Sequence, residues 1–573
     1  MIPAGRRKAT VTPWVATFIL IACGLWWSTA PAHQTPNANA IASAHPLATA
    51  AGHEILDAGG NAFDAAIAVT ATLAVVEPYG SGIGGGGFWL LHRQSDSYQV
   101  MIDGREKAPL AAHRDMYLDE QGEVVKDLSR VGPLAAGIPG TPAALVHLAD
   151  RYGRLPLAQS LAPAIRAARD GFEVTEHYRR MAEFRLDTLR QDRETAAIFL
   201  ADNQTPTPGH VIKQPDLART LEAIAQHGAD GFYGGEIARQ LVAGVRAAGG
   251  IWTEADLTQY NVVERQPIIG DYRGIRIVSA APPSSGGIAL VTMLNILAGY
   301  DLNPLSEVDR THLIIEAMRR AYRDRAQYLG DSDFVQIPIE RLTHPHYAAG
   351  LRAGIRPDSA TPSAQLPGVQ LDQAGQDTTH FSILDAEGNR VAATLSINFP
   401  FGAAFTPPGT GVLLNNEMDD FSAKPGVANA YGLVGAEANA IAPGKRPLSS
   451  MTPTFLESSD GIAILGTPGG SRIITMVLLG ALEFAAGKPP TDWVSRGRFH
   501  HQFLPDAVQF ETGGLSPELQ TGLAEKGHQF KPVDRRYGNM HAILWDRRRG
   551  EVSAASDPRG GGEARVQRLP PAH

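Results

Sequence analysis

The most informative feature of this sequence is an abrupt change of pattern at Asp377. The segment before it, RPDSATPSAQLPGVQLDQ (356–373), is rich in Pro, Ser and Gln and has no apolar period, so it predicts a loop. From Thr378 onwards polar and apolar residues alternate through THFSIL, the turn-like DAEGN follows, and VAATLSI resumes an extended pattern. This order predicts a β-hairpin that starts where an irregular loop ends.

Helical patterns surround this strand-rich part of the chain. Two helical segments precede Pro78, amphipathic patterns dominate 130–350, and an apolar pattern covers IITMVLLGALEFAAG (473–487). Strands framed by helices on both sides in the sequence predict a layered α/β arrangement. The chain has 573 residues, of which 43% are hydrophobic, so it can bury a substantial core.

Charge and glycine patterns argue against several classes of protein. The formal charge is −8 and no basic stripe is visible in the sequence, so nucleic acid is not an expected partner. Gly80, Gly82 and Gly85 match G-x-G-x-x-G, but a helical pattern precedes them and an extended one follows, the reverse of a dinucleotide fingerprint. We interpret this run as a loop that permits close backbone approach. The histidine pairs lack a carboxylate in ligand register, so no metal site is expected.

The N-terminus carries a secretory signal pattern. A basic RRK (6–8) precedes an apolar run (13–27), and an A-x-A site ends at Ala32, so residues 1–32 are interpreted as a cleaved signal peptide. Two alternatives stay open: the LIAC that ends at Cys23 is lipobox-like and would give a lipid anchor, or the apolar segment stays as an uncleaved anchor. All three predict an exported protein, periplasmic or secreted.

Two threonines open the predicted hairpin, and a threonine hydroxyl is a useful nucleophile only when a base lies beside it. A chain-terminal threonine carries such a base in its own α-amino group, whose reference pKa of about 7.7–8.0 leaves a useful neutral fraction near neutral pH. An internal Thr378 has no such amine, so the chain would have to be cut between Asp377 and Thr378. By spacing alone, the commoner explanation of a Thr-Thr pair is the high β-propensity of threonine.

Many long segments, in order along the chain, resemble the γ-glutamyltranspeptidase family of N-terminal-nucleophile hydrolases. The most specific are GGGGF, DGREKAP, DTTHFSILDAEGNRVAATLSIN, GVLLNNEMDDFSAKPG, NAYGLVG, KRPLSSMTPT, TPGGSRI and RFHHQFLPD. The resemblance implies a four-layer αββα sandwich and self-cleavage between Asp377 and Thr378. After the signal peptide, a heavy chain (33–377) and a light chain (378–573) would associate as a heterodimer that forms one unit, with Thr378 as the mature nucleophile.

The resemblance also implies a site for a γ-glutamyl group, which presents an α-carboxylate and an α-ammonium. Arg105 would hold the carboxylate, because a planar guanidinium fork suits it, and Ser449 and Ser450 would add donors. The acceptors for the ammonium would be Asn398, Glu417 and Asp420. Relatives have Gln where this chain has Glu417, but a carboxylate there still accepts from an ammonium.

Four further positions carry roles that the resemblance implies. Gly469 and Gly470 would offer backbone N–H groups to the tetrahedral oxyanion. Ser396 would orient the nucleophile, and Tyr431 would belong to a lid over the donor site. The pair Phe399-Pro400 lies where family members differ, so the acceptor side of the site is less defined by the resemblance.

The function expected from these residues is that of a γ-glutamyltransferase and glutathione hydrolase. Thr378 would attack glutathione or another γ-glutamyl compound, and water or an amino acid or dipeptide acceptor would resolve the γ-glutamyl ester, with no cofactor. Two alternatives stay open. One is a cephalosporin or glutaryl-type acylase of the same fold, and the other is an unprocessed, non-catalytic periplasmic binding protein.

Overall fold

The computed structural model describes residues 35–366, 378–422, 424 and 436–569. The predicted features that lie outside the described residues are the signal peptide 1–32 with Cys23, the cleavage-site residue Asp377, and Tyr431. Within the described ranges, no helix is both long enough and apolar enough to cross a bilayer.

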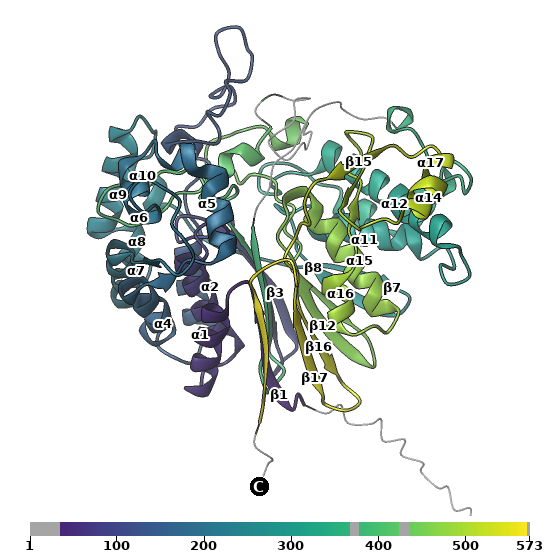
Figure 1. The fold of residues 1–573 in the computed structure, drawn as a ribbon, viewed down its shortest axis with the longest axis horizontal. Helices are drawn as coiled ribbons and strands as arrows, with labels where there is room; N and C mark the ends of the chain where they lie inside the picture. The colour runs from purple at the N-terminus through teal and green to yellow at the C-terminus, as the bar shows by residue number, and fades with distance from the viewer. Residues whose placement is uncertain (1–34, 367–377, 423, 425–435, 570–573) are drawn as a thin grey trace, which may run out of the picture.

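Two antiparallel sheets form the centre of the described part of the molecule (Figure 1). The seven-stranded sheet has the order β18-β1-β9-β10-β2-β3-β6 and the six-stranded sheet has the order β17-β16-β12-β11-β8-β7. The strands of the first sheet are β1 (Ala38–Ser43), β2 (Gly86–Arg93), β3 (Tyr98–Gly104), β6 (Val263–Arg265), β9 (Thr379–Leu384), β10 (Arg390–Ser396) and β18 (Glu563–Arg568). Those of the second are β7 (Ile268–Tyr272), β8 (Ile275–Ser279), β11 (Thr454–Glu457), β12 (Gly461–Gly466), β16 (His541–Asp546) and β17 (Val552–Ser556). Two small sheets pair β4 (Phe172–Glu173) with β5 (Val211–Ile212), and β13 (Phe499–His500) with β14 (Val508–Glu511) and β15 (Phe530–Val533).

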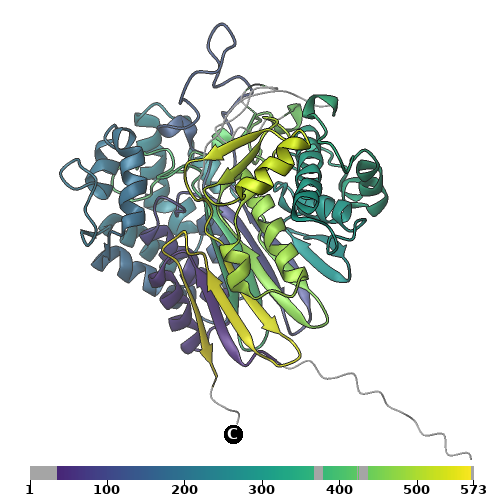
Figure 2. The same ribbon diagram turned by 45° about the vertical axis from the view of Figure 1, so that its right-hand side comes forward.

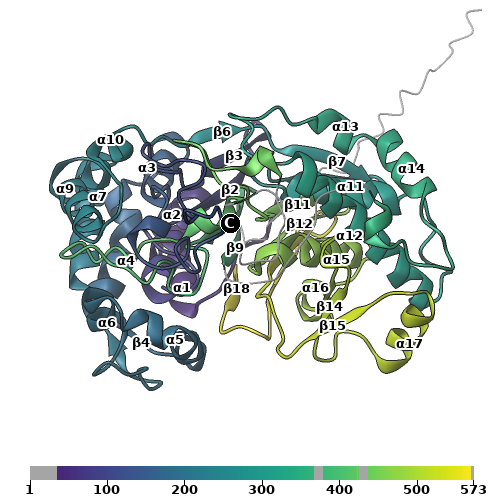
Figure 3. The same ribbon diagram turned by 90° about the horizontal axis from the view of Figure 1, so that it is seen from above.

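Helices cover the outer face of each sheet, so the molecule has four layers, as predicted (Figures 1 and 3). The first helical group consists of α1 (Pro46–Asp57), α2 (Ala62–Val76), α3 (Thr141–Arg151), α4 (Leu157–Asp170), α5 (Glu176–Leu189), α6 (Arg193–Phe199), α7 (Pro215–His227), α8 (Asp230–Tyr233), α9 (Gly235–Ala247) and α10 (Glu254–Thr258). The second consists of α11 (Gly286–Leu297), α12 (Glu307–Tyr328), α13 (Ile339–Thr343), α14 (Pro345–Ala353), α15 (Ile473–Ala485), α16 (Pro490–Ser495) and α17 (Pro517–Glu525). Short 3₁₀ turns lie at η1 (Pro133–Ala135), η2 (Ser363–Gln365), η3 (Glu417–Asp420), η4 (Glu437–Asn439) and η5 (Gly470–Arg472).

The predicted hairpin is confirmed as the pair β9 and β10, whose register joins Leu384 to Arg390 and Thr379 to Leu395. Its polar face does not meet water, although an alternating strand commonly has one solvated face. The second sheet covers this face, and His380 is fully buried with its Nδ1 2.9 Å from the hydroxyl of Thr394. Hydrogen bonds therefore satisfy the polar side chains between the two sheets.

Strand β1 lies between two strands that both come from the part of the chain after residue 378. It pairs with β18 on one side, where Ala38 faces Arg568, and with β9 on the other, where Ala40 faces Leu384. Figure 2 shows β1 beside the C-terminal strand at the lower edge of the sheet. The two ends of the chain thus contribute adjacent strands to one sheet.

The glycine run before β2 is a close-approach loop, as the sequence predicts. A Cβ at Gly85 would lie 2.1 Å from the carbonyl oxygen of Ser396, and one at Gly84 would lie 2.1 Å from that of Leu413. Neither distance is compatible with a side chain. The loop therefore fits directly against the end of β10, where two predicted site residues lie.

Candidate active site

Thr378 lies immediately before β9 and borders two cavities. Its exposed fraction is 8%, so it is buried but reachable. The small cavity, of about 20 Å³, holds space for roughly one water molecule. Besides Thr378 it is lined by Arg325, Ser396, Asn398, Glu417, Asp420, Ser449, Ser450 and Gly470. The large cavity, of about 360 Å³, lies against Thr378 and Gly469 and opens between α5 and the segment that precedes β16.

The strand pair β9 and β10 fixes the position of Thr378. Thr379 faces Leu395 in the register, so Ser396 at the end of β10 lies across from Thr378. The hydroxyl of Thr379 donates to the buried carboxylate of Glu77 over 2.6 Å, which ties the residue after the threonine to the end of α2. A threonine held in this way presents its hydroxyl from a rigid element rather than from a loop.

A tight turn after β10 positions Ser396 and Asn398. Asn398 has a φ of 72°, in the left-handed region that asparagine tolerates better than most residues. Its backbone N–H donates to the Ser396 hydroxyl over 2.7 Å, and its side-chain amide donates to the carbonyl of Asn416 over 2.9 Å. The Ser396 hydroxyl also hydrogen-bonds the carboxylate of Glu417. The structure therefore brings three predicted site residues into one network.

Arg105, at the end of β3, is completely buried and donates to both Glu417 and Asp420, which the turn η3 presents together. Its Nε also donates to the carbonyl of Pro447 over 3.3 Å. Burial alone would lower the pKa of Arg105, but the carboxylates of Glu417, Asp420 and Glu106 outweigh it and raise the pKa. The groups expected to bind the two charges of a substrate thus contact one another directly.

Burial also raises the pKa values of the two carboxylates that pair with Arg105. Burial, opposed by Arg105, raises the pKa of Glu417 to about 7. Burial likewise raises the pKa of Asp420, again against the effect of Arg105. Glu417 is therefore poised to change its protonation state near neutral pH.

Arg325 of α12 is a site residue that the sequence analysis missed. Its side chain is buried, its terminal NH2 donates to the Ser450 hydroxyl over 3.1 Å, and its Nε donates to the Ser285 hydroxyl over 2.9 Å. Burial lowers its pKa to about 10. A signal was present in the sequence, because position 325 falls on the buried stripe of α12 that contains Met318 and Tyr322. An arginine on such a stripe requires polar partners.

The remaining predicted residues complete the borders of the two cavities. The small cavity is bordered by Ser449, Ser450 and Gly470, and the large cavity by Gly469. Ser449 is held by its neighbours, since its N–H donates to the carbonyl of Pro283 over 2.9 Å. Gly469 and Gly470 have φ values of 142° and 56°, which place the backbone next to Thr378 in conformations that favour glycine. The described part of the chain contains no cluster of three or more His, Cys, Asp or Glu side chains arranged to hold a metal ion.

A family model described as gamma-glutamyltranspeptidase matches residues 48–566. The chain belongs to this family. The family membership expected from the motifs is therefore confirmed, and with it an enzyme of the hydrolase and transferase type.

Several known proteins are similar to this chain over most of their own length. The glutathione hydrolase proenzyme of Pseudomonas sp. (strain A14) is 46% identical over 86% of this chain and 86% of its own. A crystal structure of Helicobacter pylori gamma-glutamyltranspeptidase is 41% identical, with a TM-score of 0.56, over 57% of this chain and 94% of that chain. A cephalosporin acylase from Bacillus halodurans has a TM-score of 0.81 at 28% identity and covers 96% of this chain and 99% of that chain. These likenesses confirm the predicted fold class.

Proposed function

We propose that this chain is a γ-glutamyltransferase and glutathione hydrolase with Thr378 as its nucleophile. The observation that carries the proposal is the position of Thr378 at the border of a small cavity lined by the carboxylates of Glu417 and Asp420, which both pair with the buried Arg105 guanidinium. Relatives named glutathione hydrolase proenzyme support the substrate class.

The proposal includes self-cleavage between Asp377 and Thr378, which gives a heavy chain of 33–377 and a light chain of 378–573 that stay together as a heterodimer. Two observations support it. The relatives are named proenzymes. The H. pylori structure contains a chain that matches 57% of this one while 94% of its own length is covered, and residues 33–377 make up about three-fifths of the 573 residues.

The charged groups at the small cavity match the two charges of an amino acid zwitterion, and the cavity, which holds about 20 Å³, has to widen to admit one. A substrate α-carboxylate would take the Arg105 guanidinium, with Ser449 and Ser450 as further donors. The α-ammonium would take the freed carboxylates of Glu417 and Asp420 and the side-chain oxygen of Asn398. Each buried ion pair of the empty site is exchanged for an equivalent pair with the substrate, so no charge is left buried alone.

The chemistry then follows from the free α-amino group of Thr378. This amine takes the proton of the Thr378 hydroxyl as Oγ bonds to the γ-carbonyl carbon, and the backbone N–H groups of Gly469 and Gly470 donate to the oxyanion. The C–N bond breaks, the proton passes to the leaving amine, and a γ-glutamyl ester remains. Water, or the amine of an amino acid or dipeptide, attacks this ester in the reverse sense and frees the hydroxyl. Ser396 orients the nucleophile from the neighbouring strand.

An acylase of cephalosporin or glutaryl type is the second candidate, since an acylase shares the fold closely. A glutaryl group carries a carboxylate that would draw Arg105 away from Glu417 and Asp420, but it has no ammonium to replace Arg105 beside them. The γ-glutamyl assignment is therefore favoured. A non-catalytic binding protein would need neither a cut chain nor a threonine at this border.

The test compares γ-glutamyl-4-nitroanilide with glutaryl-4-nitroanilide on purified protein whose chain ends are determined by mass analysis. We expect two fragments with Thr378 as one N-terminus, and release of nitroaniline from the γ-glutamyl compound at least a hundredfold faster. A preference for glutaryl would support the acylase, and an uncut inactive chain would support the binding protein. The same measurement reports whether an exported, periplasmic or secreted form begins after Ala32 or at a lipid-modified Cys23.

A further inference from the structure

A further cavity, the outer cavity, holds about 480 Å³ between the start of α12, the end of α15 and the turn that joins β7 to β8. Figure 1 shows these elements on the same side of the molecule. The opposite ends of the two helices border the small cavity, through Arg325 of α12 and Ile473 of α15. Helical rise separates Arg310, which lines the outer cavity, from Arg325 by about 22 Å. The outer cavity is therefore remote from the nucleophile.

The size and part of the wall of the outer cavity suit a small organic molecule. Cavities that bind such molecules measure roughly 300–1,000 Å³ and are lined largely by apolar side chains. Tyr272, Leu302 and Ile314 line the outer cavity and are buried, and Leu482 of α15 lies beside them on the wall. An apolar group placed against these side chains would be removed from water.

The rest of the wall carries an excess of positive charge. Four cationic side chains line the outer cavity against one carboxylate, that of Glu483. The cationic residues are Arg273, Arg310, Lys488 and Arg496. Glu483 forms an ion pair with Arg496, and no carboxylate of the described residues forms one with the other three.

Two of these cations lie close together and are incompletely paired. The Nε of Arg310 is buried and has no hydrogen-bond partner among the described residues, while one of its terminal nitrogens donates to the carbonyl of Leu305 over 3.2 Å. Burial and the charge of Arg310 both lower the pKa of Arg496, against the opposite effect of Glu307. A buried donor without an acceptor, next to a second guanidinium, is a place where an anion would be stabilised.

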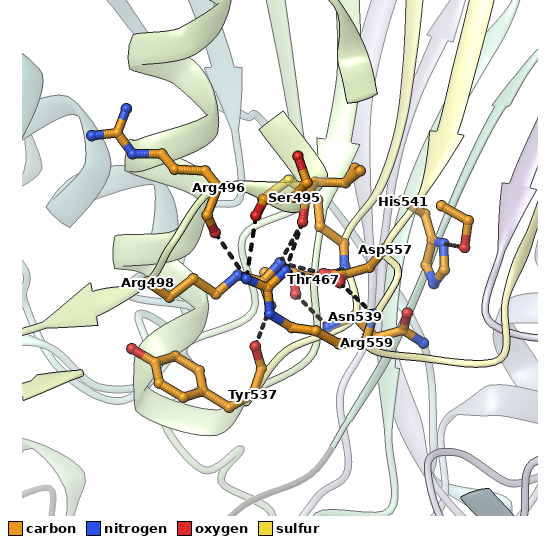
Figure 4. Close-up of polar contacts among 12 residues, drawn as sticks. Thr467, Ser495, Arg496, Arg498, Tyr537, Asn539, His541, Asp557 and Arg559 are labelled. Atoms are coloured by element: carbon orange, nitrogen blue, oxygen red, sulfur yellow. Dashed lines mark hydrogen bonds and ion pairs between the residues drawn. The ribbon is translucent and has the colours of Figure 1, made fainter. Parts of the chain in front are cut away.

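The backbone of Arg496 is fixed, so its side chain is presented to the outer cavity from a rigid position. Arg559 donates to the carbonyls of Val494 and Arg496, each over 2.9 Å, and is itself neutralised by Glu511 and Asp557. Figure 4 shows the Arg496 side chain pointing away from this network. A guanidinium held in place before a ligand arrives loses little freedom on binding it.

We propose that the outer cavity is a binding site for a phosphate monoester with an apolar body, such as an aryl or alkyl phosphate. The planar forks of Arg310 and Arg496 bind the phosphate oxygens, and Arg273 and Lys488 add positive charge from the exposed rim. A phosphate monoester carries a charge of about −1.5 to −2 near pH 7, so it balances this wall better than a single carboxylate does. The inference is independent of the proposed function, because no described residue lines both the outer cavity and a cavity at Thr378.

The experiment measures binding to the purified full-length protein by isothermal titration calorimetry in a phosphate-free buffer. Phenyl phosphate and octyl phosphate share the phosphate and differ in the body, inorganic phosphate lacks the body, and benzoate lacks the phosphate. The unaltered protein is compared with Arg310→Gln, Arg496→Gln and the double variant. Arg239→Gln, on the exposed surface of α9, is the matched control. Melting temperatures without ligand report whether each variant is folded.

We expect one site per chain for a phosphate monoester, with a dissociation constant at least tenfold lower than those of inorganic phosphate and benzoate. The double variant should bind at least tenfold more weakly, whereas Arg239→Gln should bind as the unaltered protein does. Arg310→Gln should keep or raise the melting temperature without ligand, because it relieves the repulsion between two guanidinium groups. Tighter binding of octyl phosphate would support a lipid-like ligand, and tighter binding of phenyl phosphate a soluble aryl one.

Three results would overturn the site. Unchanged affinity in the double variant would place the ligand elsewhere on the chain. Inorganic phosphate or benzoate that binds as tightly as phenyl phosphate would contradict the ligand class. A lowered melting temperature in Arg310→Gln with unchanged binding would make Arg310 a structural residue.

Discussion

The Arg325 guanidinium donates to the hydroxyl of Ser450 over 3.1 Å and binds Ser285 with its other edge, deep inside the molecule. It therefore fixes one of the two serines expected to hold the substrate α-carboxylate. It also adds positive charge beside that position, because no carboxylate of the described residues forms an ion pair with it.

Replacing Arg325 should weaken donor binding more than the chemical step. We expect Arg325→Met to raise the KM for γ-glutamyl-4-nitroanilide about tenfold or more with a smaller change in kcat, since the Ser450 hydroxyl loses its donor. Arg325→Lys keeps the charge but not the two-edged contact, so its KM should lie between the two. If kcat falls as much as KM rises, and both changes follow a lowered melting temperature, Arg325 would instead be a purely structural residue.

Removing the hydroxyl of Thr378 should abolish both cleavage and turnover. Thr378→Ala should run as one band near the full 61.1 kDa less its signal peptide, with activity at background. Thr378→Ser keeps a hydroxyl and an amine on adjacent carbons, so it should still split, more slowly. Denaturing gels and N-terminal analysis decide the matter, and a Thr378→Ala chain cut before residue 378 would contradict self-processing.

The protonation of Glu417 should appear in the pH dependence of donor binding. The pKa of Glu417 is raised from 4.5 to about 7, so its carboxylate is lost as pH falls through about 7, and the KM for the donor should rise below that pH. Glu417→Gln should remove this inflection and leave a flatter profile. A profile of kcat/KM from pH 5 to 9 for both proteins measures it, and an unchanged inflection in Glu417→Gln would assign it to another group.

The raised pKa of Glu417 also makes folding stability depend on pH, and stability falls with rising pH whereas donor binding improves. Between about pH 4.5 and 7 the folded protein binds the Glu417 proton more tightly than the unfolded chain, so this group's contribution to stability falls as pH rises through that window. Above pH 7 Glu417→Gln should therefore lose less stability than it does at pH 5. Melting temperatures of both proteins at pH 5 and pH 8 give the comparison.

The glycine run should tolerate no side chain where it meets β10. Gly85→Ala would place a Cβ 2.1 Å from the Ser396 carbonyl oxygen, so the end of β10 must shift. We expect a loss of about 1–3 kcal/mol of stability and a larger fall in processing and activity. Gly350→Ala in α14 is the matched control, because its Cβ meets nothing within 4 Å, and it should be neutral or slightly stabilising.

The hairpin, the layered fold and the close-approach glycine loop were predictable from the sequence because each depends on local periodicity or on a single residue type. The buried polar face of β9 was not predictable locally. The alternation around His380 is the pattern of a half-solvated strand. Only the second sheet, built from residues 268–279 and from strands after residue 450, determines that this face is covered.

Some residues of the candidate site were likewise predictable from the sequence, and others were not. Thr378, Arg105 and Asp420 lie in long motifs, so family resemblance found them although their spacing did not. Arg325 lies in no such motif. It reaches the site through tertiary packing of α12 against the segment that carries Ser450.

The placement of β1 between β9 and β18 has a consequence for a chain severed before Thr378. Strand β1, from the first fragment, then pairs along both edges with strands of the second fragment. It pairs with β9 over Ala40–Ser43 and with β18 over Ala38–Ser43. Separating the pieces would expose unpaired strand edges and open the central core, so the nicked molecule can come apart only by melting. Such halves, expressed from separate genes, would have to fold around each other instead of docking ready-made.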